Sequence, residues 1–102
     1  YKRQLVEQRL RERGAALNTS KDWTAALSSY QQALALTRSH PEAAYAEALA
    51  LRGTGYALIE LGDLDAAQKA YEDSLALEPG NKVAENELTY IRQQRKRQTG
   101  KP

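Results

Sequence analysis

One stretch of this chain occurs twice, at an offset of 41 residues. Residues 14–36 are written again as residues 55–77 without an insertion, and eleven aligned positions keep their size and polarity. The matched pairs are Gly14 and Gly55, Leu17 and Leu58, Asp22 and Asp63, Trp23 and Leu64, Ala25 and Ala66, Ala26 and Ala67, Tyr30 and Tyr71, Ala33 and Ser74, Leu34 and Leu75, Ala35 and Ala76, and Leu36 and Leu77. A repeat of this length is one supersecondary unit that cannot bury its apolar face alone and stacks on its copy. We therefore expect a repeat scaffold built for binding.

The apolar composition favours helices over strands. Hydrophobic residues make up 41% of the 102 residues and are mainly Ala and Leu, whereas the β-branched apolar residues occur only at Val6, Ile59, Val83 and Ile91. A sheet has little to be made from, because strands are enriched in β-branched and aromatic residues. Six glycines and three prolines are few for the chain and cluster at a few points, as expected for long helices joined by short turns. The predicted fold class is all-α.

The apolar spacing predicts five helices, over residues 2–18, 23 to about 40, 42–61, 64–77 and 82–97. Asp22 and Asp63 are placed to cap the second and fourth helices, because a carboxylate there accepts hydrogen bonds from unpaired backbone N–H groups. Gly62 suits a left-handed end for the third helix. The apolar stripes are Leu5, Leu10, Gly14, Ala15 and Leu17 in the first helix; Trp23, Ala26, Leu27, Tyr30, Ala33, Leu34 and Thr37 in the second; and Ala84, Leu88 and Ile91 in the fifth.

These residues resemble the pattern of the tetratricopeptide repeat family. Over residues 48–81 the chain has Leu51, Gly55, Leu58, Ala67, Tyr71, Ser74 and Pro79 at the family's spacing. Over residues 7–40 it has Leu10, Gly14, Leu17, Ala26, Tyr30 and Ala33, but Arg38 stands where the proline belongs. The offset exceeds the family's usual 34 by seven residues, around Thr37 to Ala43, and we expect these to lengthen the second helix and to start the third early.

The resemblance implies an α-solenoid in a single domain over residues 1–97. Repeat one would span 7–40, a longer linker region 41–47, repeat two 48–81 and a capping helix 82–97, with a frayed basic tail at 98–102. In function it implies a non-catalytic protein–protein interaction module that binds a peptide or a helix in a concave groove. Counted from the repeat starts, the groove-facing side chains are Arg11, Ala15, Asn18, Arg52, Tyr56, Ile59, Asn86, Tyr90 and Gln93.

The arginines of this groove suit a peptide carboxylate, because a guanidinium offers paired donors. The alternative is that Arg11 and Arg52 only solvate the groove or pair with glutamates. The two-carboxylate clamp of chaperone-binding family members is not expected, since Ala15 and Gly53 stand where its asparagines are needed.

Charge is strongly segregated along the chain and leaves two other functions open. Residues 1–14 carry +3, residues 15–91 carry −6 and residues 92–102 carry +5, for a net charge of +2. Opposite charges could draw copies of the domain together into a homo-oligomer or structural scaffold. Weak nucleic-acid binding through Arg92–Arg97 is a third hypothesis, but the run lacks interleaved aromatics and nucleic acid is not the expected partner.

Nothing in the sequence indicates catalysis, a cofactor or a metal. The chain has no cysteine, and its one histidine, His40, is expected to be exposed in a turn beside Pro41. Gly53-Thr54-Gly55 falls within a helix, where it indicates close helix packing rather than a phosphate loop. No apolar run is long enough for a membrane span. A start at Tyr1 and the lack of Met suggest a processed product or an excised fragment; a cytoplasmic location is favoured, with periplasmic or secreted locations left open.

Overall fold

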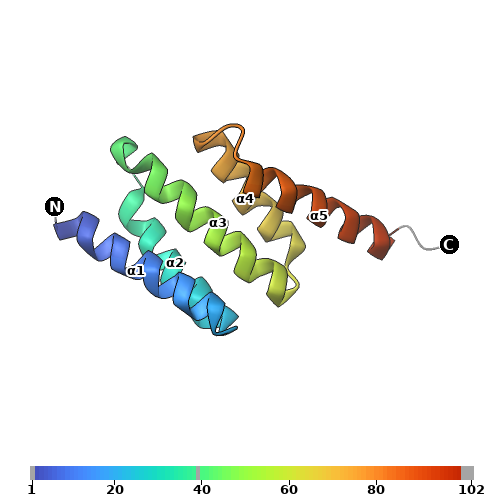
Figure 1. The fold of residues 1–102 in the computed structure, drawn as a ribbon, viewed down its shortest axis with the longest axis horizontal. Helices are drawn as coiled ribbons and strands as arrows, with labels where there is room; N and C mark the ends of the chain where they lie inside the picture. The colour runs from blue at the N-terminus through green and yellow to red at the C-terminus, as the bar shows by residue number, and fades with distance from the viewer. Residues whose placement is uncertain (1, 39, 100–102) are drawn as a thin grey trace.

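The computed structural model describes residues 2–38 and 40–99, and all regular secondary structure in these ranges is helical. The elements are α1 (Lys2–Thr19), α2 (Trp23–Thr37), the 3-10 turn η1 (Pro41–Ala43), α3 (Ala44–Leu61), α4 (Leu64–Leu77) and α5 (Lys82–Thr99). Figure 1 shows the helices following one another along the long axis of an elongated body of 55 × 29 × 19 Å. α1–α2 and α3–α4 form two helical hairpins, α2 packs on α3, and α5 packs on α4. The predicted all-α architecture of two helical hairpins and a fifth helix is confirmed.

Most of the inserted residues lie in front of α3, because α2 ends at Thr37, before the predicted end near His40 and Pro41. α2 has 15 residues and α4 has 14, so the second helix is only one residue longer than its counterpart. The early start of the third helix is confirmed, because η1 begins at Pro41 and runs directly into α3. Proline suits a first helical position, where its missing N–H costs nothing. The expected lengthening of the second helix therefore amounts to a single residue.

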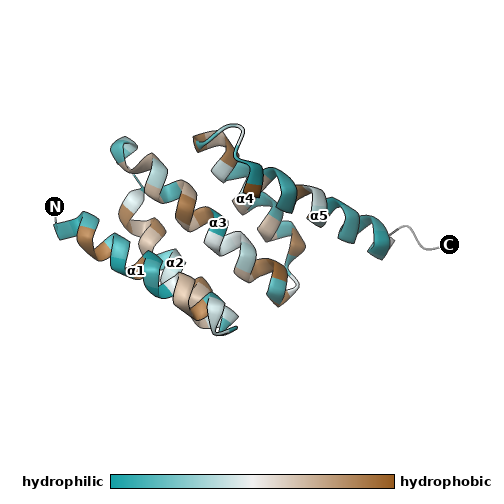
Figure 2. Cartoon of the chain, viewed as in Figure 1, coloured by the Kyte–Doolittle hydropathy of each residue, from teal (hydrophilic) through white to brown (hydrophobic). Residues whose placement is uncertain are grey.

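The C-terminal helix is longer than predicted. α5 continues to Thr99, past the expected end at Arg97, and its last turn is basic, with Lys96 and Arg97. Cations at this end favour the helix because its terminal carbonyls carry partial negative charge. The expected frayed tail over 98–102 is thus helical at its start, and residues 100–102 lie outside the described ranges. Figure 2 shows that the last turns of α5 are mostly hydrophilic.

The predicted caps are in place. The Asp63 carboxylate accepts from the Ala66 N–H at 3.1 Å, and the Asp22 carboxylate accepts from the Ala25 N–H at 3.4 Å. Gly62 ends α3 at φ 87°, in the left-handed region that a residue without a β-carbon adopts at little cost.

Removing a cap should destabilise the fold measurably. We expect Asp63→Ala to lower the free energy of unfolding by about 1 kcal/mol, because an N–H at the helix start loses its acceptor. Asp22→Ala should cost less, since its hydrogen bond is longer. Urea unfolding followed by circular dichroism measures both, with exposed Glu60→Ala as the control. A similar loss in all three variants would contradict this explanation.

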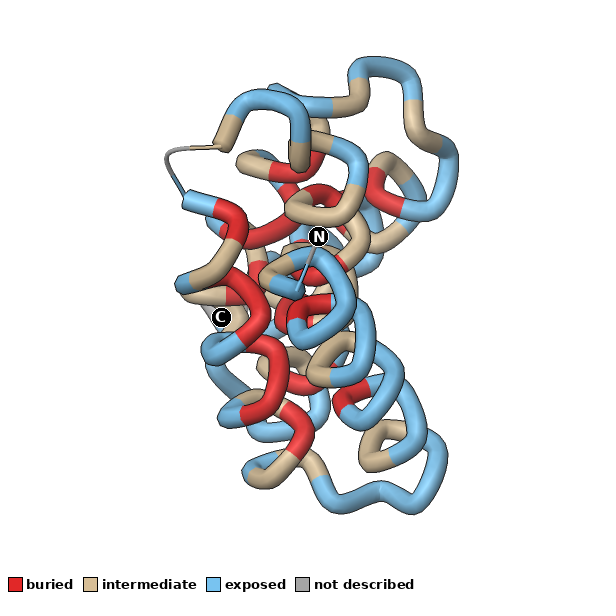
Figure 3. The backbone as a smooth tube through the Cα atoms, turned by 90° about the vertical axis from the view of Figure 1, so that its left-hand side faces the viewer, coloured by how far each residue is buried: buried red, intermediate tan, exposed pale blue. Residues whose placement is uncertain are grey.

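Two apolar clusters form the core, one where α2 meets α3 and one where α4 meets α5. The first contains Tyr30, Ala33, Leu34 and Ala50, and the second contains Ala67, Tyr71, Ala84, Leu88 and Ile91. Figure 3 shows the buried positions running along the helices on the sides that meet one another. The predicted stripe of α5 is confirmed, since Ala84, Leu88 and Ile91 are all buried.

The predicted stripe of α1 needs correction. Leu5 is 37% exposed and Ala15 is also exposed, whereas Glu7, which the sequence assigns to no apolar face, is only 5% exposed. α1 contacts α2 along its length but has few contacts with α3, so it has a narrower face to bury than α3 does. Gly14 is buried as predicted, with Leu10 and Leu17 half-buried.

Each core tyrosine occupies space that glycines leave open. A β-carbon at Gly14 would lie 2.7 Å from the Tyr30 ring, and one at Gly55 would lie 2.5 Å from the Tyr71 ring. Gly53 of α3 also contacts the Tyr30 ring, which is therefore held between α1 and α3. The interpretation of Gly53-Thr54-Gly55 as close helix packing is confirmed.

Candidate functional site

Two exposed tyrosines occupy equivalent repeat positions on α3 and α5. Tyr56 of α3 and Tyr90 of α5 are 34 residues apart in the sequence and are 43% and 41% exposed. The Trp23 ring, at the start of α2, meets the Tyr56 ring edge to face, with centroids 5.6 Å apart and an interplanar angle of 70°. This geometry is favourable for aromatic pairs and orients Tyr56 while leaving part of its ring accessible. The predicted residues Asn86 and Gln93 on α5 are exposed as well.

Both arginines predicted for the groove are paired with glutamates. Arg52 Nη1 lies 2.6 Å from Glu78 Oε1, and the Arg52 side chain is only 13% exposed. Arg11 Nε lies 2.9 Å from Glu7 Oε2, with a second, longer bond of 3.4 Å from Nη2 to Oε1. These contacts match the alternative stated from the sequence, that the two arginines pair with glutamates. Arg52 also ties α3 to the loop between α4 and α5, where Glu78 lies.

Two other predicted groove residues lie at helix junctions. Asn18 is half-buried, and its Nδ2 donates to the Gly53 carbonyl at 3.2 Å, which joins α1 directly to α3. Ile59 packs against the buried cluster around Tyr71. Both side chains therefore hold the helices together in this structure.

The buried phenols are structural groups. Tyr71 donates to Glu87 Oε2 at 3.3 Å. Burial raises the pKa of Tyr71 well above its usual value, and the nearby Glu87 charge raises it further. Burial also raises the pKa of Tyr30, although the charge of Arg11 opposes the effect. Both phenols are therefore neutral at pH 7.

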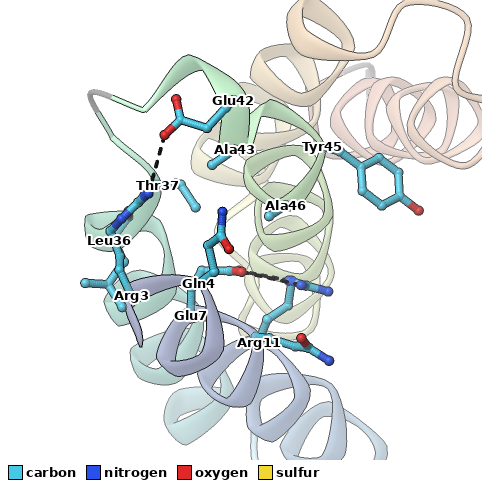
Figure 4. A pocket seen from close by; sticks show the side chains of 11 residues that line it. Arg3, Gln4, Glu7, Arg11, Leu36, Thr37, Glu42, Ala43, Tyr45 and Ala46 are labelled. Carbon is cyan, nitrogen blue, oxygen red and sulfur yellow. Dashed lines mark hydrogen bonds and ion pairs between the residues drawn. The ribbon is translucent and has the colours of Figure 1, made fainter. Parts of the chain in front are cut away.

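A pocket of about 260 Å³ opens between α1 and the start of α3. Figure 4 shows its walls, which come from α1, the end of α2, η1 and the first turn of α3. The lining residues are Arg3, Gln4, Glu7, Gln8, Arg11, Leu36, Thr37, Glu42, Ala43, Tyr45 and Ala46. The sequence prediction found only Arg11 among them. The seven inserted residues were the available signal, because they supply the wall formed by Glu42 and Ala43.

No group of His, Asp and Glu side chains in the described ranges is arranged to hold a metal ion. His40 is half-buried rather than exposed, and its Nδ1 lies 3.3 Å from Glu42 Oε1. None of the helices described here is long and apolar enough to cross a membrane.

Two stacked helical hairpins with a fifth helix packed on the second define a helical-repeat protein. Within it, residues 48–81 match the family model of the tetratricopeptide repeat. The match covers α3 from Ala48 onward, α4 and the loop after α4, and it confirms the resemblance for the second repeat. Such repeats are typical of protein–protein interaction modules, which are generally non-catalytic. No curated protein and no solved structure matches the chain.

Proposed function

We propose that this chain is a non-catalytic interaction module that binds an extended peptide or a helix in a groove lined by α1, α3 and α5. The observation that carries the proposal is the pair of exposed phenols, Tyr56 and Tyr90, at equivalent positions of α3 and α5. Tyrosine is enriched among the residues that dominate binding energy, because it offers a large rigid contact area and a polar tip.

The internal ion pairs refine this proposal. Arg11 and Arg52 already bind Glu7 and Glu78, so a partner would have to displace a carboxylate to reach either guanidinium. The phenols of Tyr56 and Tyr90 need no such exchange. We therefore propose that the middle of the groove recognises its partner through aromatic contacts, with the amides of Asn86 and Gln93 beside them.

The proposal predicts that Tyr56→Ser together with Tyr90→Ser removes most partner capture by the immobilised chain. Loss of a residue that dominates an interface costs about 2 kcal/mol or more, which is roughly a 30-fold loss in affinity. Leu61→Ser is the matched control, because Leu61 lies on the same helix as Tyr56 and is 44% exposed against 43%. Circular dichroism should show unchanged helicity in all variants. Capture that survives the double substitution, or that is lost equally in the control, would exclude this groove.

The two other hypotheses have less support from the described surfaces. End-to-end stacking of copies on α1 would bury Arg9 and Arg13, which are exposed, at the positions where α3 buries Ala50 and Thr54. In the basic run of α5, Arg95 is engaged within the chain, with Nη2 at 2.8 Å from Asp65 and Nη1 at 2.5 Å from Gln68. The groove is therefore the preferred site.

A further inference from the structure

The pocket between α1 and α3 has an ion pair at its mouth that a ligand could replace. Arg3 Nη2 lies 3.4 Å from Glu42 Oε1, and Arg3 Nη1 donates to the Leu36 carbonyl, also at 3.4 Å. The Glu42 side chain is 57% exposed and the Arg3 side chain 30%. Glu42 Oε1 also lies 3.3 Å from His40 Nδ1, whose side chain is likewise open to water. Ion pairs this exposed contribute only about 0–1 kcal/mol each, so Glu42 can exchange these partners for water at low cost.

The second ion pair of the pocket is fixed. The Glu7 side chain is 7% exposed and accepts two hydrogen bonds from Arg11. Displacing it would leave a buried charge unpaired, which is strongly unfavourable. Glu7 and Arg11 therefore stay paired with each other, while Arg3 can exchange its carboxylate partner.

Other groups in the pocket suit a carboxylate on a short apolar stem. Figure 4 shows the Gln4 amide pointing into the space between Thr37 and Ala46. Gln4 makes no hydrogen bond with the described part of the chain, so its amide N–H groups are available as donors. Ala43 and Ala46 provide an apolar wall, and 260 Å³ suits one side chain better than a drug-sized molecule.

We propose that this pocket is a subsite for a glutamate side chain of the bound peptide. The ligand carboxylate replaces Glu42 on Arg3 and accepts from the Gln4 amide, while its methylene groups pack on Ala43 and Ala46. The net charge of +3 on residues 1–14 attracts an acidic partner to this end of the groove. The inference rests on the proposed function for the identity of the ligand as a peptide.

The test uses N-acetylglutamic acid α-amide as a minimal probe, titrated into the whole chain. Backbone amide shifts in NMR spectra report binding at Ala43 and Ala46. We expect saturable shifts confined to the pocket, with a Kd on the order of millimolar for so small a ligand. Arg3→Gln should abolish them. Glu42→Gln should tighten binding severalfold, because it removes the internal competitor for Arg3.

The controls distinguish specific binding in the pocket from non-specific attraction of the anionic probe to the positive charge of α1. Arg9→Gln removes the same charge from the exposed outer side of α1 and should leave binding nearly unchanged. An equal loss in Arg9→Gln, or equal binding of the probe's uncharged glutamine or cationic lysine counterpart, would overturn the subsite. Tighter binding of N-acetylglycine would assign the pocket to a chain terminus instead. These outcomes are independent of capture through Tyr56 and Tyr90, so the subsite and the groove can fail separately.

Discussion

Gly53→Ala will lower the free energy of unfolding by about 1–3 kcal/mol, the usual cost of overfilling a well-packed core. The sign of this change is informative, because Gly53 lies within α3 and alanine is the better helix former by about 1 kcal/mol. Helix propensity alone would therefore make Gly53→Ala stabilising. The added β-carbon would overlap the Tyr30 ring and hydroxyl. Tyr30 is only 4% exposed and is enclosed by α1 and α3, so it has little room to retreat. Urea unfolding followed by circular dichroism measures the loss.

A double-mutant cycle tests the cause. In a Tyr30→Leu background the overlap with the ring is relieved, and Gly53→Ala should become neutral or stabilising. A penalty of the same size in both backgrounds would show that the clash with Tyr30 is not responsible.

Glu78→Gln should destabilise the chain more than Arg52→Met does. Removal of the Glu78 charge leaves Arg52, which is 13% exposed, without its carboxylate, and a hydrogen bond to a charged group contributes about 1.5–3 kcal/mol. Removal of Arg52 instead leaves Glu78 at 35% exposure, where water can solvate it. The free energies of unfolding measure the asymmetry. Hydrogen exchange should show the larger loss of protection in α5, because Glu78 lies in the loop that leads to it.

Asp73→Asn is the matched control for this pair. It breaks the ion pair between Lys69 and Asp73, whose side chains are 77% and 48% exposed, and should change stability by less than about 0.5 kcal/mol. Equal losses for Glu78→Gln and Arg52→Met, or a loss in the control as large as theirs, would contradict the role given to this ion pair.

The residues that determine the fold act on neighbours close to them in the sequence, which explains why the hairpins could be predicted. Asp22 and Asp63 act within one turn of their own helix, and Gly62 acts through its own backbone. Gly14 lies against Tyr30 in the first hairpin and Gly55 against Tyr71 in the second, so the repeat itself reveals the pairing.

The candidate site depends on contacts that the spacing of residues does not show. Arg52 and Glu78 are 26 residues apart and meet only after α4 has folded back on α3. Glu7 and Arg11 lie one turn apart, a pattern common on solvated helix faces, and the burial of Glu7 depends on the neighbouring helices. The spacing also did not show where the inserted residues lie. Continuation of α2 beyond Thr37 competes with a new helix start at Pro41.

The inserted segment would also make the proposed groove directional. Equivalent positions of α1 and α3 are 41 residues apart, as Gly14 and Gly55 are, whereas those of α3 and α5 are 34 apart, as Tyr56 and Tyr90 are. A pocket lies between α1 and α3, whereas beside α3 the partly buried hydrogen bond from Tyr71 to Glu87 joins α4 to α5. A peptide that spans α1, α3 and α5 would meet different surroundings between each pair of helices. Reversing its chain direction or sliding it by one repeat would therefore misplace its side chains.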